Sequence, residues 1–327
     1  MRTAVILGGT GQIGAAISNR LLSLGWNVTI TSRSLPSAGT NARHEIVDAS
    51  DTKSLIKTLS SPTDLLVSCV AYSQEDATAL LNSSGNVGRI VAISSASVYQ
   101  DKQGRTLDEA RENGFPFFDG PMDESTATVA PGPQTYSTRK MAMEARLAEQ
   151  NVLPVNLLRP CAVHGPLSSH AREWWFVKRI LDGRERIPIA YDGKSQFQTS
   201  SVEAIADSVV LAADRKLPVV ANVCDADSPN VREIGQAIMQ SMGASIELVG
   251  LGSKDYPPVA GATPWSLPQS FTLTSVAPGK LSYAETVRPT VEWLAREVNE
   301  TNWKEKLPEL AGYPYNHFDY SIDDAVI

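Results

Sequence analysis

The chain of 327 residues carries 29 Lys and Arg against 36 Asp and Glu, a net charge of −7, and 42% of its residues are hydrophobic. Such length and composition are those of a globular protein with a large core and two domains. The acidic balance argues against bulk binding of nucleic acid or of an anionic membrane surface, and no apolar run approaches the roughly 20 residues of a membrane span.

The chain begins with a predicted strand and helix that are joined by a glycine-rich turn. Residues 4–7 are apolar, as in a strand buried on both faces, and residues 15–22 continue with helical spacing. Gly8, Gly11 and Gly14 lie between them at three-residue spacing. Unpaired N–H groups and the helix dipole attract an anion to such a helix start, and glycines let a pyrophosphate come close. The stretch predicts a dinucleotide site rather than a glycine-rich turn without a ligand.

Neither the start of the chain nor its cysteines indicate export. Arg2 precedes a short apolar run, but the glycines interrupt that run, so we expect a first strand and a cytoplasmic protein rather than a signal peptide. Three widely separated cysteines resemble buried hydrophobic residues more than a disulfide framework or a zinc site: Cys69, Cys161 and Cys224. His164 and His170 have no metal-like partners in spacing, so we expect them to be structural and expect no metal site.

The next elements alternate between strands and helices. Strands are predicted at 26–31, 45–48, 64–71, 88–95 and 153–159, and helices at 52–60, through 80–81 and at 135–149. This alternation predicts an α/β fold with a doubly wound parallel sheet and helices on both faces. Residues 100–133 interrupt it with a long polar segment that contains Phe115-Pro-Phe-Phe118. Because loops of this length are usually functional, we expect this segment to form a flap over the substrate.

The pattern is less regular after residue 166. Helices are predicted at 171–182, 203–213, from 231 and near 290–299, strands near 187–191 and at 219–223, and irregular structure at 250–290. We expect residues 1–165 to form a dinucleotide-binding Rossmann domain, completed by about 196–225. Residues 166–195 and 226–327 then form a smaller, discontinuous substrate-binding domain.

Three polar side chains are candidates for catalysis. Tyr136 and Lys140 share a face of the helix predicted at 135–149, although this spacing is also common on ordinary solvated helix faces. An ammonium near a phenol lowers the pKa of the phenol, which suits a general acid or base. Ser95 follows a central strand, where ligands of open parallel sheets bind, and can hydrogen-bond a substrate oxygen. Ser94 and Ser97 fit the alternative role, capping a turn, better than Ser95 does.

These motifs together resemble the short-chain dehydrogenase/reductase superfamily, in its extended or atypical branch of NAD-dependent epimerases and dehydratases. The resemblance spans about residues 4–235 and rests on the glycine motif, Ser95-Ala-Ser-Val-Tyr99, Tyr136-x-x-x-Lys140 and Leu158-Arg-Pro-Cys-Ala-Val-His-Gly-Pro166, with a weaker echo at Asn222-Val-Cys-Asp225 and Val231-Arg-Glu-Ile234. It implies that Ser95 orients the substrate oxygen and that Tyr136 exchanges its proton. Lys140 would lower the pKa of the tyrosine and hold the nicotinamide ribose.

The resemblance also implies which residues hold the cofactor. They are Gly8, Thr10, Gly11, Gln12, Ile13, Gly14, Ser32, Arg33, Asp48, Val70, Ala71, Tyr136, Lys140, Pro160 and Val163. NAD enzymes of this fold place an acidic residue at the end of the second strand, where this chain has Thr31-Ser-Arg33. Ser32 can donate to a 2′-phosphate and Arg33 can pair with it, so we expect NADP, with NAD as the alternative. The competing interpretation of Arg33 is a solvated loop charge.

We expect an NADP-dependent oxidoreductase that transfers hydride to or from a carbonyl or alcohol of a small metabolite. The alternatives are a nucleotide-sugar epimerase or dehydratase with tightly held NAD(P), and a non-catalytic NADP-binding redox sensor, against which the Tyr136 and Lys140 pair speaks. Nucleotide-sugar enzymes usually carry an arginine where this chain has Phe197-Gln-Thr. Three other arginines could replace it: Arg172, Arg179 and Arg184. We expect a small-molecule substrate, no nucleic-acid or membrane partner, and leave a homodimer open.

Overall fold

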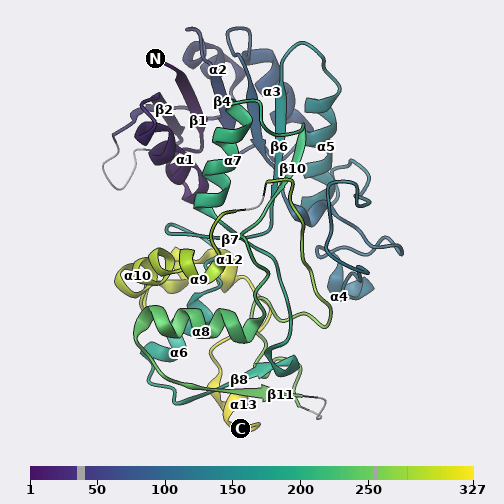
Figure 1. The fold of residues 1–327 in the computed structure, drawn as a ribbon, viewed down its shortest axis with the longest axis vertical. Coiled ribbons are helices and arrows are strands. Elements are labelled where there is room, and N and C mark those ends of the chain that lie inside the picture. Colours follow the sequence, from purple (N-terminus) through teal and green to yellow (C-terminus); the bar gives the residue numbers. More distant parts are fainter. Residues whose placement is uncertain (35–40, 253–255, 278) are drawn as a thin grey trace.

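Seven parallel strands form the central sheet of the computed structural model, which describes residues 1–34, 41–252, 256–277 and 279–327 (Figure 1). They lie in the order β10-β6-β5-β4-β1-β2-β3. Their bounds are β1 (Thr3–Leu7), β2 (Asn27–Ser32), β3 (Arg43–Ile46), β4 (Leu65–Ser68), β5 (Ile90–Ile93), β6 (Val155–Pro160) and β10 (Val220–Val223). The order reverses between β1 and β4, and ligands of such sheets bind outside the carboxyl ends of the strands at this point. The prediction of a doubly wound parallel sheet is confirmed.

Helices cover both faces of the sheet and bury a separate core on each (Figure 1). On one face, α1 (Gln12–Ser23) packs with α7 (Val202–Ala213), and on the other lie α2 (Thr52–Thr58), α3 (Gln74–Ser83) and α5 (Tyr136–Ala148). Side chains of a strand point alternately to its two faces. In β1, Ile6 therefore joins the core under α1 and α7, whereas Leu7 joins the core under the other three helices.

A third core lies beyond the sheet, in the lower half of Figure 1. It is built on α6 (Trp174–Leu181), α8 (Val231–Met242), α9 (Tyr283–Thr286) and α10 (Arg288–Glu297), and Trp174, Trp175 and Trp265 are fully buried in it. Two small parallel pairs accompany it: β8 (Arg186–Ala190) with β11 (Glu247–Leu251), and β7 (Ala162–His164) with β9 (Thr199–Ser201). The division into a dinucleotide-binding domain and a substrate-binding domain stays a prediction.

The segment 100–133 has little regular structure beyond the single turn α4 (Ala110–Asn113). Hydrogen bonds at Asp101 and at Met122 fix it in place. The Asp101 carboxylate accepts hydrogen bonds from the backbone N–H groups of Arg105 and Phe117 and pairs with the Arg105 side chain. Farther along, Met122 exchanges backbone hydrogen bonds with residues 272 and 274. Phe117 is 46% exposed. The flap over the substrate stays a prediction.

Several element boundaries differ from those predicted. β3 begins at Arg43 and ends at Ile46, so that Asp48 lies after the strand and accepts a hydrogen bond from the Ser50 N–H. The strands β7, β9 and β11 were not predicted. β7 and β9 have only three residues each, and β9 is polar, so neither carries a clear strand pattern. The C-terminal tail adds the short helices α11 (Trp303–Lys306), α12 (Pro308–Ala311) and α13 (Tyr320–Asp324).

Candidate functional site

The glycine-rich turn places the start of α1 close against β1. Gly8 has a φ of +78°, and a Cβ on Gly14 would lie 2.3 Å from the Gly8 carbonyl oxygen, so neither position tolerates a side chain. Gly11 precedes α1 and offers no side-chain cap. Within the described ranges, the N–H groups of Gln12, Ile13 and Gly14 have no acceptor. A turn with free N–H groups at a helix start fits the pyrophosphate of a dinucleotide.

A hollow of about 570 Å³ extends from this turn over the ends of β2 and β4. Seven of the predicted cofactor residues line it: Gly8, Thr10, Gly11, Ser32, Arg33, Asp48 and Val70. The Ser32 hydroxyl donates to the Ser34 carbonyl oxygen and lies 2.7 Å from Nε2 of His44. His44, on β3, is a neighbour that the sequence analysis missed, since nothing distinguishes it from an ordinary strand residue.

A second pocket, of about 540 Å³, contains the predicted catalytic residues. Seven predicted residues line it: Gln12, Ile13, Ser95, Tyr136, Lys140, Pro160 and Val163. It shares Tyr72 with the hollow beside β2, so the two pockets are contiguous. The remaining predicted residues lie just behind these walls, Gly14 inside the turn and Ala71 under Lys140.

Lys140 is buried, with 2% of its surface exposed, and two backbone carbonyls hold its ammonium. Nζ donates to the carbonyl oxygens of Ala71 at 2.7 Å and Ile93 at 2.9 Å, which lie beyond β4 and at the end of β5. An ammonium has three N–H donors, so one remains for a ligand. Nζ also lies 4.3 Å from the ring centre of Tyr72. Burial lowers the pKa of Lys140 to about 8.

The pKa of Tyr136 is raised, whereas the sequence analysis expected Lys140 to lower it. Tyr136 is 38% exposed. Partial burial and the neighbouring Tyr72 raise the pKa of its phenol to about 12, and a hydrogen bond with Ser95 opposes the rise. The ammonium does not offset the burial, because it is directed to two carbonyl oxygens and lies 5.8 Å from the Tyr136 ring centre. Without ligands, Tyr136 is therefore a protonated phenol at neutral pH, ready to donate a proton.

The assignment of the loop serines was partly wrong. Ser95, not Ser94, caps the short helical turn of residues 96–98, and its Oγ accepts a hydrogen bond from the Ser97 N–H at 3.1 Å. Ser94 instead donates to the buried carboxylate of Glu144 at 2.5 Å, and Ser97 accepts a hydrogen bond from the Ser137 hydroxyl. A hydroxyl can accept and donate at once, so Ser95 keeps its proton available to the pocket.

A buried polar network fixes the helix that carries Tyr136 and Lys140. The Glu144 carboxylate of α5 accepts two hydrogen bonds from Arg159 of β6, at 3.0 and 2.6 Å. Arg159 also donates to the Tyr99 hydroxyl, which in turn donates to Asn222 of β10. Charge-assisted, bidentate contacts of this kind fix geometry, so α5 is held in register with the sheet edge that forms the pocket.

Residues of the less regular C-terminal part complete the pocket. Phe197, His170, Arg172 and Glu309 line it opposite the sheet, and Asp108 comes from the segment 100–133. Of the three arginines considered in the sequence analysis, Arg172 lines this pocket. The other two form ion pairs elsewhere, Arg179 with Asp323 and Arg184 with Asp324. Burial lowers the pKa of His170 to about 2, so that ring is neutral.

His164 lies behind the pocket in a buried pair. Its Nε2 is 2.8 Å from the Asp225 carboxylate, which also accepts hydrogen bonds from the Thr199 hydroxyl and the Ser201 N–H. The pair thus joins β7 to β9 and to the end of β10. In the ranges that the structure describes, no group of three or more His, Cys, Asp or Glu could hold a metal ion, and no helix is long and apolar enough to cross a membrane.

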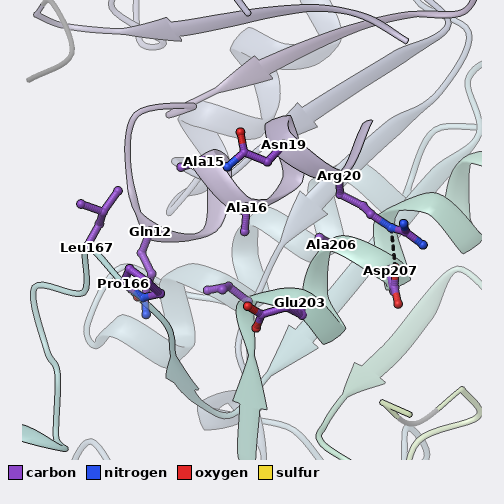
Figure 2. A pocket seen from close by; sticks show the side chains of 11 residues that line it. Gln12, Ala15, Ala16, Asn19, Arg20, Pro166, Leu167, Glu203, Ala206 and Asp207 are labelled. Carbon is purple, nitrogen blue, oxygen red and sulfur yellow. Dashed lines mark hydrogen bonds and ion pairs between the residues drawn. The ribbon is translucent and has the colours of Figure 1, made fainter. Parts of the chain in front are cut away.

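A separate groove of about 530 Å³ lies between α1 and α7 (Figure 2). Ala15, Ala16 and Ala206 leave space between the two helices, and an ion pair of Arg20 with Asp207 closes one end. None of the predicted catalytic residues lines this groove. It meets the catalytic pocket only through Gln12, whose amide donates to the Gly165 carbonyl oxygen. The predicted catalytic residues thus line the pocket around Tyr136 and not this groove.

The chain is similar to known proteins in sequence profile and in fold. The profile of the NAD dependent epimerase/dehydratase family matches residues 4–224. No curated protein sequence matches the chain. The fold is similar to that of UDP-glucose 4-epimerase from Thermotoga maritima, with 17% identity, coverage of 91% of this chain and 100% of the other, and a TM-score of 0.68.

Two further solved structures show the same fold. UDP-N-acetylglucosamine 4-epimerase from Methanobrevibacter ruminantium, in complex with UDP-N-acetylmuramic acid, is 21% identical over 91% of this chain and 99% of its own, with a TM-score of 0.67. dTDP-glucose 4,6-dehydratase from Bacillus anthracis, in complex with NAD, is 15% identical over 94% of this chain and 100% of its own, with a TM-score of 0.68. At these identities the likeness concerns the fold.

Proposed function

The chain belongs to the NAD-dependent epimerase/dehydratase family, and on this premise we propose that it is an NAD(P)-dependent enzyme acting on a nucleotide sugar. It would oxidise a secondary alcohol of the sugar and return the hydride to the same molecule, as in epimerisation or dehydration. The observation that carries the proposal is the pocket in which Ser95, Tyr136 and Lys140 face one space contiguous with the glycine-rich turn. The solved structures of similar fold, named for UDP-sugar and dTDP-sugar enzymes, support the substrate class.

The residues divide the chemistry between them. The free N–H groups of Gln12, Ile13 and Gly14 would bind the pyrophosphate of the cofactor, and the third N–H of Lys140 would bind its ribose. Bound nicotinamide accepts or supplies a hydride. When a carbonyl is reduced, the Tyr136 O–H gives its proton to the carbonyl oxygen, and the Ser95 hydroxyl can donate a hydrogen bond to the phenolate that remains. When an alcohol is oxidised, the same proton returns to Tyr136.

Ser95 would orient the reacting oxygen, because its hydroxyl lies in the same pocket and interacts with the Tyr136 phenol. Holding the oxygen between two hydroxyls fixes the distance over which the proton moves. Tyr72 would shield Lys140 from water, since its ring covers the ammonium. The pocket also contains the carboxylates of Asp108 and Glu309, either of which could serve a second proton transfer in a dehydration.

The experiment incubates the purified protein with UDP-glucose and dTDP-glucose and follows the sugar by NMR. Conversion of the sugar without net change in the nicotinamide absorbance would support an epimerase or dehydratase. Tyr136→Phe protein is the control and should leave the sugar unchanged. Failure of the parent protein to convert either sugar or any other nucleotide sugar, with NAD or NADP supplied, would contradict the proposal.

A second candidate is an NADP-dependent oxidoreductase of a small metabolite, which would consume its cofactor. The end of β2 favours NADP, because Ser32 and Arg33 line the hollow there and the β2 terminus itself carries no carboxylate. Phe197 also stands where nucleotide-sugar enzymes usually carry an arginine. Steady consumption of NADPH with a carbonyl compound would favour this candidate over the first. We also propose that the chain divides into a dinucleotide-binding and a substrate-binding domain and that it can form a homodimer.

A further inference from the structure

Arg172 is a charged side chain that lines the pocket around Tyr136. It lies in the turn just before α6, and its Nε is fully buried without a hydrogen-bond acceptor. Across the described ranges, its guanidinium takes part in no hydrogen bond or ion pair. The next residue, Glu173, accepts a hydrogen bond from the Tyr283 hydroxyl. Burial raises the pKa of the Glu173 carboxyl and the nearby charge of Arg172 opposes that rise, but no ion pair joins the two side chains in the described ranges.

The other charged groups that line the pocket are all engaged. Two carbonyl oxygens hold Lys140, the Asp108 carboxylate accepts from the Ser137 N–H, and the Glu309 carboxylate accepts from the Ser169 hydroxyl. His170 is neutral. Among the described charged residues that line this pocket, Arg172 differs from Lys140, Asp108 and Glu309 in that its side chain makes no hydrogen bond.

Of the Arg172 nitrogens, Nε is the one that is buried without an acceptor, and the side chain as a whole is partly exposed. A buried N–H without an acceptor loses its water without gaining a hydrogen bond in return. The planar guanidinium also presents paired donors that match the two oxygens of a phosphate or a carboxylate. A ligand oxyanion would satisfy both the charge and the donors. Phe197, in the same pocket, cannot supply that charge.

We propose that Arg172 binds an oxyanion of the substrate, a phosphate or a carboxylate, and so selects anionic over neutral substrates. The inference rests on the proposed function only for the location of the substrate, not for the reaction. The substrate then spans the pocket, with its anionic group at the turn before α6 and its reacting oxygen at Tyr136.

The test measures binding of three anions to the parent protein with bound NAD(H) or NADP(H), by calorimetry. The probes are inorganic pyrophosphate, glucose 1-phosphate and glucuronate, and glucose is the neutral control. A charged hydrogen bond contributes enough that Arg172→Met should weaken binding of the preferred anion about tenfold or more. Arg172→Lys, which keeps the charge but not the fork, should bind with intermediate affinity. Comparison of the two phosphates with glucuronate identifies the oxyanion.

Arg139→Met is the matched control, because Arg139 is exposed on α5 and lies outside the pocket lining. It should bind all probes as the parent does. Cofactor affinity should be the same in all variants. Melting of the ligand-free proteins gives a second readout: Arg172→Met and Arg172→Gln should melt at or above the temperature of the parent, since they remove an unpartnered buried donor.

Equal affinity of parent and Arg172→Met for every anion would overturn the inference, as would failure of the parent to bind any of the three. A lower melting temperature of both Arg172→Met and Arg172→Gln would also overturn it, because the side chain would then be structural. The proposed reaction fails separately. Arg172-dependent anion binding without conversion of any nucleotide sugar would support the role of Arg172 and contradict the proposed reaction. Conversion of a nucleotide sugar that Arg172→Met leaves unaffected would support the reaction and contradict the role of Arg172.

Discussion

At the scale of single residues, the proposed proton transfer depends on Tyr136, whose pKa is raised so that the phenol stays protonated. Tyr136→Phe removes one oxygen and leaves the ring, so the fold and the cofactor affinity should be unchanged. Loss of a positioned general acid should lower the rate about 10²–10⁴-fold. Steady-state turnover of a verified substrate, beside calorimetric cofactor binding, checks both parts. Tyr72→Phe is the control and should keep most activity, because the ring that covers Lys140 remains.

Lys140 makes the free energy of unfolding depend on pH in a defined window. Its pKa is about 8 in the folded protein and 10.5 for an ordinary lysine, so between these values the unfolded chain binds more protons. The contribution of Lys140 to the free energy of unfolding therefore rises from pH 8 to 10.5. Urea unfolding of the parent and of Lys140→Met across this range should show a difference that changes with pH. A constant difference would show that Lys140 titrates as an ordinary lysine.

Arg33 should decide the choice of cofactor. A charged hydrogen bond to phosphate contributes roughly 1.5–3 kcal/mol, so Arg33→Ala should weaken NADPH binding about tenfold or more. NADH binding should change little, because NADH lacks the 2′-phosphate. Calorimetry with both cofactors gives the comparison. Equal affinity of the parent protein for the two would make Arg33 a solvated loop charge.

The sequence predicted single residues where chemistry requires a particular side chain at a fixed spacing. Gly8 lines the hollow beside β2, and Ser95 and Tyr136 line the neighbouring pocket. It did not predict the partners that tune them. Tyr72 and His44 come from other elements, and only the folded chain brings Tyr72 over Lys140 and His44 against Ser32.

At the scale of elements, the buried pair of His164 and Asp225 joins three short strands. Removing one partner of a buried pair leaves the other uncompensated, so Asp225→Asn should lower the free energy of unfolding by about 3–5 kcal/mol at neutral pH. Urea unfolding measures this loss. His164→Asn, and the double variant, then give the coupling between the two side chains. A loss in Asp225→Asn no larger than at an exposed carboxylate such as Asp214 would contradict the prediction.

The pH dependence of this pair has a definite sign. Burial opposes ionisation of both groups, but their mutual hydrogen bond raises the pKa of His164 and lowers the pKa of Asp225. The pair therefore stabilises the fold between the lowered carboxyl pKa and the raised imidazole pKa. Its contribution is lost as pH falls through the first value and as pH rises through the second. The difference between parent and Asp225→Asn should be largest inside that window.

Elements of the sheet were predictable because buried parallel strands are continuous apolar runs, as residues 4–7 and 90–93 are. β9 was not predictable in the same way. It reads Thr199-Ser-Ser201, with no hydrophobic pattern, and its position depends on pairing with β7 and on the Asp225 carboxylate. Tertiary contacts, rather than local preference, make it a strand.

At the scale of the whole molecule, the cofactor should stabilise both the sheet and the C-terminal core. Trp26 lies in a core of the sheet, whereas the third core contains Trp174, Trp175 and Trp265. In a Trp26→Phe variant, fluorescence reports only on the C-terminal part. Cofactor at a hundredfold excess over its Kd should raise the free energy of unfolding by about 2.7 kcal/mol. Fluorescence and circular dichroism should record the same increase in the free energy of unfolding, because backbone hydrogen bonds such as those of Met122 with Thr272 and Thr274 connect the two parts. A fluorescence transition that cofactor does not shift would show that the C-terminal part unfolds independently.

One of those shared contacts also affects the order in which the newly made chain can fold. Met122 exchanges backbone hydrogen bonds with Thr272 and Thr274, and the Asn222 amide donates to the Thr274 carbonyl oxygen. During synthesis the ribosome releases residues 1–224 first, and domains begin to fold as they emerge. The segment around Met122 must then wait, with its edge unpaired, until residues 272–274 leave the exit tunnel. Phe271 and Glu309, which also line the pocket around Tyr136, are synthesised late as well, so this pocket is completed only near the end of translation.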